Sequence, residues 1–239
     1  MIIKTFVTFF DFLNNPATPH GKKYLNNIKA FFILFFFSMC ADYLLDLLST
    51  NNWMINKFKI TNIESHAQQI YTDGFWLSLV SLVILAPVVE ELLQRSYLTS
   101  FVWNNVMVPI NIGVIMIFVF QIKGFYLLIF CFLLLISMFI INDKVSNKKS
   151  KIKYLKLYSK NYKFYFYLSA ISFGAVHIAN YRAENFIPIL SIFLVLPQIF
   201  AGLILGYIRV SMGLRWSICF HALHNLFFLT FLFINHSAK

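Results

Sequence analysis

Charged residues are scarce in this chain: they make up 12% of its 239 residues, about half the share usual in soluble globular proteins. Glycine and proline are also few, at 8 and 6 residues, which argues against a disordered, collagen-like or linker-rich chain. The three cysteines, Cys40, Cys131 and Cys219, lie in apolar stretches without a CxxC pair. The sequence therefore predicts neither a disulfide framework nor a zinc ribbon.

Apolar residues are what the chain has in excess. They form 59% of the sequence and include 29 phenylalanines, which is well above the soluble range and indicates a membrane protein. The formal charge of +11 would suggest a nucleic-acid partner in a soluble protein. Here the basic residues cluster between apolar runs, so we attribute the charge to membrane topology and expect no nucleic-acid partner.

The hydropathy pattern predicts an all-α fold: a polytopic transmembrane helix bundle with about seven spans in one integral membrane domain, residues 1–239. The stretch Met1–Leu13 is apolar but lacks a small-x-small cleavage site, which favours a helix lying in the membrane interface over a removable signal peptide. No internal repeat is visible. The expected spans are 29–49, 75–99, 105–120, 124–142, 164–182, 187–207 and 213–234.

The distribution of lysine predicts the orientation of these spans. The loop 143–163 carries eight lysines against the single acid Asp143, so the positive-inside rule places it in the cytoplasm. With seven spans the N-terminus lies on the same side, where Lys4, Lys22 and Lys23 agree. The loop could also bind anionic lipid, but topology alone explains its charge.

Two adjacent carboxylates, Glu90 and Glu91, interrupt the second expected span. A charged side chain within the bilayer costs free energy, so its presence there indicates a pairing or a function. Arg95 lies four residues after Glu91, so the two share a helix face and can form an ion pair. Glu90 points about 100° away and has no such partner in its own helix. Glu91 and Arg95 therefore fit a structural clamp, whereas the unpaired Glu90 meets the requirement for a general base.

Histidines interrupt two further spans. His177 follows the small residues Gly174 and Ala175, which let helices approach closely. His221 and Asn225 are four residues apart and share one face of the last span, whereas His224 flanks that face and is expected to pack or to act indirectly. In the first span, Asp42 and Asp46 are expected to meet a helix neighbour or an interface rather than to take part in chemistry.

The depths of these groups are compatible with one site. At about 1.5 Å per residue, Glu90, His177 and His221 lie roughly 14, 20 and 12 Å from the cytoplasmic ends of their spans. An error of three or four residues in the span boundaries covers that spread. We therefore expect all three on the cytoplasmic side of the bilayer or near its middle, close enough to meet.

The order of these motifs resembles the CPBP family of intramembrane proteases. Glu90-Glu91-x-x-x-Arg95, Phe173-x-x-x-His177 and His221-x-x-x-Asn225 stand on separate hydrophobic spans, with Pro87 in the family's usual lead-in. The family includes type II CAAX prenyl endopeptidases, Abi proteins and proteins of bacteriocin processing and immunity. The resemblance covers about residues 75–234, the expected protease core, and implies location in a bacterial cell membrane.

The resemblance implies hydrolysis of a peptide bond within the membrane. Glu90 and His177 would activate water, His221 and Asn225 would stabilise the oxyanion, and Glu91 and Arg95 would support the helix. The implied partners are a membrane-associated peptide or lipidated protein as substrate, and the lipid bilayer. A divalent metal such as zinc stays open, with Glu90, His177 and His221 as candidate ligands, although no HExxH pair is present.

Two other functions remain as alternatives. A non-catalytic bacteriocin-immunity protein or membrane scaffold of the same family predicts an eroded site, whereas all the core positions are present here. A transporter or channel predicts repeated halves or helices broken at corresponding positions, and the sequence has neither. An intramembrane endopeptidase is therefore the preferred interpretation.

Overall fold

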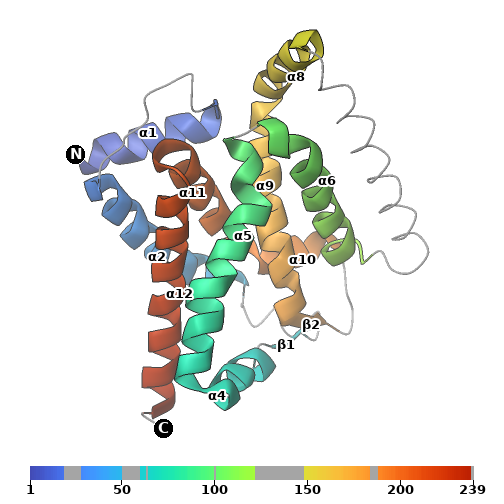
Figure 1. Cartoon of the computed structure of the whole chain (residues 1–239). Helices are drawn as coiled ribbons and strands as arrows, with labels where there is room; N and C mark the ends of the chain where they lie inside the picture. The colour runs from blue at the N-terminus through green and yellow to red at the C-terminus, as the bar shows by residue number, and fades with distance from the viewer. Residues whose placement is uncertain are drawn as a thin grey trace.

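The computed structural model of the chain describes residues 1–18, 28–49, 60–62, 64–99, 101–121, 148–183 and 188–237. Helices account for nearly all of these residues (Figure 1). The elements, in chain order, are α1 (Ile2–Asn14), α2 (Ile28–Ser49), β1 (Ile60–Asn62), α4 (Glu64–Ser78), the π-helical segment η1 (Leu79–Leu85), α5 (Ala86–Arg95), the 3₁₀ segment η2 (Ser96–Leu98), α6 (Phe101–Phe118), α8 (Lys148–Lys160), α9 (Tyr162–Val176), the 3₁₀ segment η3 (His177–Asn180), β2 (Tyr181–Ala183), α10 (Pro188–Leu194), α11 (Leu196–Met212) and α12 (Leu214–Ser237).

Three helices in the described part of the chain are long and apolar enough to cross a membrane. They are Ile28–Leu45, Ile70–Leu98 and Leu214–Ile234. Two shorter apolar helices, Met107–Phe118 and Leu196–Met212, pack among them. Many large apolar side chains lie on the outside of the bundle, where lipid rather than water is the suitable solvent. The prediction of an all-helical membrane bundle is confirmed.

The expected spans map unevenly onto these helices. The first corresponds to α2, the second to the continuous stretch from α4 to α5, the third to α6, and the last to α12. The fourth, 124–142, lies outside the described residues. The α-helix at the fifth expected span, 164–182, is shorter than expected, because α9 gives way to 3₁₀ helix at His177 and then to strand β2.

The expected span 187–207 is wrong. Two helices replace it, α10 and α11, with a break at Val195. Pro197 stands in the first turn of α11, where its missing N–H costs nothing and its ring favours a new helix start. The helix then continues to Met212 and ends at Gly213, whose positive φ of 97° suits glycine and allows the turn into α12.

Helices α9 and α11 pack closely at the centre of the bundle. A Cβ atom added to Gly202 of α11 would lie 3.0 Å from the Cα atom of Ala170 in α9, so a larger residue does not fit there. Aromatic rings from α1 complete this core. Phe12 lies edge-on to Phe166 and tilted against Tyr207, with ring centroids 5.0 and 5.1 Å apart.

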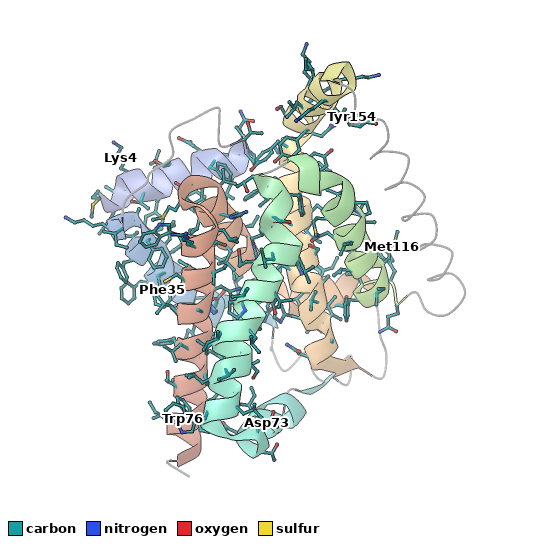
Figure 2. All side chains as sticks on the ribbon, in the orientation of Figure 1. Lys4, Phe35, Asp73, Trp76, Met116 and Tyr154 are labelled. Atoms are coloured by element: carbon teal, nitrogen blue, oxygen red, sulfur yellow. The ribbon has the colours of Figure 1, made fainter. Side chains whose placement is uncertain are left out.

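Helix α1 lies across one end of the bundle, and the lysine-rich α8 projects from the same end (Figure 1). Lys4 and Tyr154 mark this end, whereas Asp73 and Trp76 of α4 lie at the opposite end (Figure 2). The Tyr167 hydroxyl donates to the Leu13 carbonyl at 2.5 Å and fixes α1 to α9. The expected N-terminal helix is confirmed as a helix, and its place in the membrane interface stays a prediction.

A short antiparallel strand pair joins two distant segments at the end opposite α1. Ile60 pairs with Ala183 and Asn62 with Tyr181, so the segment before α4 is tied to the segment after η3. The sequence pattern did not predict this pairing, because three-residue strands leave too little alternation to detect. The pairing connects the start of the Glu90-bearing stretch to the segment that follows His177.

Candidate active site

Helix α5 places its two carboxylates differently. Glu91 lies on the fully buried face, whereas Glu90 is at the boundary, with 26% of its side chain exposed. The outer face is apolar and consists of Val88, Val89, Leu92 and Leu93. This division follows from helical geometry, since neighbouring residues point about 100° apart.

Glu91 forms the ion pair that its spacing predicts. Its Oε1 atom pairs with Nη1 of Arg95, and both side chains are fully buried. The Ser217 hydroxyl of α12 donates to the other oxygen, Oε2. The predicted clamp is therefore confirmed, and it also joins α5 to α12.

Glu90 has no hydrogen-bond partner for its buried Oε2 atom. Across the helix interface lies His221 of α12, whose Nε2 atom is 3.7 Å from Oε2. The prediction that one carboxylate is paired within the helix and the other is not is confirmed. The unpartnered oxygen can accept a hydrogen bond or a proton from a bound molecule.

His221 lies between the two glutamates and is 5% exposed. Its Nδ1 atom is 3.4 Å from Oε1 of Glu91, while Nε2 faces Glu90. A carboxylate beside one ring nitrogen orients an imidazole and directs the other nitrogen to the reacting group. Glu91 thus lies beside His221 as well as pairing with Arg95, a proximity that the sequence did not reveal.

The ring of Phe173 connects His177 to this cluster. The Arg95 guanidinium carbon lies 4.4 Å above the ring centroid, and the ring centroids of His177 and His221 lie 5.1 and 5.4 Å away. His177 stands where α9 changes to 3₁₀ helix, and its Nδ1 atom lies 3.5 Å from the amide nitrogen of Asn180. Phe173 is therefore a central packing residue of the cluster.

Asn225 contacts the same stretch of chain as His221, one turn further along α12. Its amide nitrogen donates to the backbone carbonyl of Leu82 at 2.8 Å. The expectation that His221 and Asn225 share a face is confirmed, since both face the stretch η1–α5. The structure thus brings four of the expected site residues close together: Glu90, Glu91, Arg95 and His221. His177 packs against the Phe173 ring beside them, and Asn225 bonds to the backbone of the adjoining segment.

His224 turns away from this cluster and meets Asp42 of α2. Its Nε2 atom lies 2.6 Å from Oδ2 of Asp42, with the two side chains 23% and 19% exposed. The Ser38 hydroxyl lies 3.4 Å from the same carboxylate oxygen. The expectation that Asp42 meets a helix neighbour is confirmed, and the side chain of Asp46 lies outside the described residues.

The Asp42–His224 contact predicts coupling without loss of activity. In a double-mutant cycle of Asp42→Asn and His224→Gln, we expect a coupling of about 1 kcal/mol in the free energy of unfolding, because the pair is partly buried. Unfolding in detergent micelles measures it. Additive effects would show that the contact contributes nothing, and a loss of activity in His224→Gln would place this histidine in the site.

The metal candidates do not form a ligand set in this structure. Among the described residues, no group of three or more His, Cys, Asp or Glu side chains is arranged to hold a metal ion. Glu90 and His221 approach each other, and the rings of His177 and His221 both pack against the Phe173 ring. The donors present in the cluster thus do not fit the zinc site that the three residues suggested.

Arg209 is a member of this region that the sequence analysis missed. Its Nη2 atom donates to the Thr99 hydroxyl at 2.9 Å, and its Nε atom to the Arg95 carbonyl at 3.4 Å. A cation at the carbonyl end of α5 is favourable. The signal was available, because Arg209 interrupts an apolar run just as Glu90 does.

A buried polar network fixes α5 to its other neighbours. Ser169 of α9 donates to the Gln94 carbonyl at 2.9 Å, and Ser172 lies 2.7 Å from the Gln94 side-chain oxygen. The Asn111 amide of α6 donates to the Leu93 carbonyl at 3.2 Å. No sequence motif marks these residues, because serine and asparagine are common in membrane helices.

Comparison with known proteins gives one match. The family model described as type II CAAX prenyl endopeptidase Rce1-like matches residues 72–227. This range includes all the residues of the cluster and every motif quoted above. No curated protein and no solved structure matches the chain.

Proposed function

The chain belongs to the type II CAAX prenyl endopeptidase Rce1-like family, and from this we propose that it is an intramembrane endopeptidase. Its substrate class is a membrane-associated peptide or lipidated protein, of the CAAX, leader-peptide or signal-peptide type. The observation that carries the proposal is the buried, unpartnered Glu90 oxygen beside His221 in an apolar helix bundle. A carboxylate retained there at such cost has the properties of a general base.

The proposed reaction begins with water bound at Glu90. Glu90 accepts a proton as the water oxygen attacks the scissile carbonyl carbon, and the same proton passes to the leaving amine when the C–N bond breaks. His177, which the family resemblance pairs with Glu90, would help to hold the water. The reaction consumes only water and the peptide.

The oxyanion that forms on the carbonyl oxygen needs hydrogen-bond donors. His221 would supply its Nε2–H in the doubly protonated form, in which Nδ1–H faces the Glu91 carboxylate at the same time. The Asn225 amide has two N–H groups, of which one is engaged by the Leu82 carbonyl, and the other would complete the donor pair. Glu91 and Arg95 would keep His221 and α5 in place.

The orientation follows the same proposal. We place the N-terminus and the lysine-rich loop 143–163 in the cytoplasm of a bacterial cell. Helices α1 and α8 lie at one end of the bundle, which supports a common side for both (Figure 1). Their lysines would then lie at the cytoplasmic headgroups, as the positive-inside rule requires.

Comparison of the peptides in cells carrying the wild type or Glu90→Ala tests the proposal. We expect an uncleaved precursor to accumulate with Glu90→Ala and with His177→Ala. The matched control is His224→Ala, another histidine in the membrane bundle, which should process normally. Unchanged peptides in both active-site variants would overturn the proposal, and protection from a bacteriocin by Glu90→Ala would favour the binding function instead.

A further inference from the structure

The helix that carries Glu90 is not a regular α-helix on its approach to the site. Residues Leu79–Leu85 form a π-helix, in which each N–H bonds to the carbonyl five residues earlier. The pattern reaches Ala86, whose N–H donates to the Ser81 carbonyl. The next donor in the series would be residue 87, and its acceptor would be the Leu82 carbonyl.

Residue 87 is proline, which has no N–H to donate. The π-helical pattern therefore leaves the Leu82 carbonyl without the donor that would continue it. A carbonyl inside an apolar bundle needs another donor, because water is not available to replace the missing bond. Asn225 provides one, with its amide nitrogen 2.8 Å from the Leu82 oxygen.

We infer that Asn225 is a positioning residue that keeps the π-helical segment in register and thereby aims Glu90 at His221. Pro87 lies three residues before Glu90, so the end of the π-helix sets the rotation of the next turn. Relaxation to regular α-helix would shift the register by one residue and turn α5 by about 100°. Glu90 would then leave His221, which lies 3.7 Å away in the present register.

Helix α12 thus makes two contacts one turn apart, and both act on the helix of Glu90. His221 meets the carboxylates themselves, and Asn225 meets the backbone that carries them. This role rests on the proposed function and adds to it, since it assigns Asn225 an effect on Glu90 as well as on the oxyanion.

The test restores the missing backbone donor. Alanine at position 87 supplies an N–H, so Pro87→Ala should make the Asn225 contact dispensable. We expect Asn225→Ala to lower both the Tm in detergent and the rate of processing, by about 10²-fold for a displaced catalytic group. The double variant should recover the Tm, together with the part of the processing rate that is lost through displacement of Glu90, while the loss of the oxyanion donor remains. If Asn225→Ala yields no folded protein, recovery of folded protein in the double variant is the equivalent result.

Pro109→Ala is the matched control, because Pro109 also lies inside an apolar helix, but in α6 rather than in the helix that carries the Leu82 carbonyl. It should not relieve the effect of Asn225→Ala. A Tm that stays as low in Pro87→Ala/Asn225→Ala as in Asn225→Ala, with no gain in processing, would overturn the inference, since Asn225 would then not hold the segment. Failure of the proposed function appears separately, as processing that survives Glu90→Ala, and the recovery of Tm still decides whether Asn225 holds the segment.

Discussion

Replacement of Glu90 by glutamine is expected to lower the rate of peptide-bond cleavage by about 10²–10⁴-fold, the usual contribution of a general base. Glutamine has nearly the same shape but cannot accept a proton from water. The Tm should stay the same or rise, because the buried Oε2 atom has no hydrogen-bond partner to lose. Cleavage by the purified enzyme of the precursor found in cells, together with thermal unfolding in detergent, measures both quantities.

Asp42→Asn is the matched control for this experiment. It makes the same chemical change, carboxylate to amide, in another partly buried acid of the bundle, and its partner His224 lies outside the candidate site. The control should cleave at close to the wild-type rate. Cleavage by Glu90→Gln within a few-fold of the wild type would remove Glu90 from the role of base, and a large fall in Tm would give it a structural role instead.

Local spacing made part of this site predictable. The four-residue interval between Glu91 and Arg95 places both on one helix face. Each charge would be costly to bury alone in an apolar helix, so the two are expected to pair. By elimination the neighbouring Glu90 stays unpaired within its helix. These inferences needed one helix and no knowledge of how the helices pack.

Contacts between helices were harder to predict from the sequence. His221 and His224 are three residues apart on α12, and the sequence ranks them without showing that one faces Glu90 and the other Asp42. The family resemblance implies that Asn225 lies at the reacting centre, whereas its contact in the structure is with the backbone carbonyl of Leu82. Side-chain patterns do not display such an acceptor, because it depends on a π-helix whose hydropathy resembles that of an α-helix.

Hydropathy predicted the boundaries of the spans poorly for a related reason. Hydropathy is nearly continuous across Val195, so the break between α10 and α11 depends on one proline and on packing. Pro197 was visible in the sequence, but a proline within an apolar run predicts a kink as readily as a new helix. Arg209 lies beyond residue 207, where the expected span ends, so the span pattern did not mark it as a charge within a helix of the bundle.

Removal of the Arg95 charge should destabilise the protein more than any other single change in the cluster. Arg95→Met leaves Glu91 fully buried without its cation, and breaking a buried pair in this way costs about 3–5 kcal/mol in the free energy of unfolding. Phe173 would also lose the guanidinium that lies over its ring. Chemical unfolding in detergent micelles measures the loss.

The double variant Glu91→Gln/Arg95→Met separates the charge from the shape. Neither residue is then charged, and glutamine can still accept the hydrogen bond of Ser217, so most of the lost stability should return. Processing should stay low, because a neutral amide orients His221 less strongly than the carboxylate 3.4 Å from its Nδ1 atom. Stability that falls by the sum of the single changes would show that the two side chains are not coupled. Normal processing in a stable double variant would show instead that Glu91 supports the helix and does not orient His221. Glu90 and His221 would then act without help from Glu91.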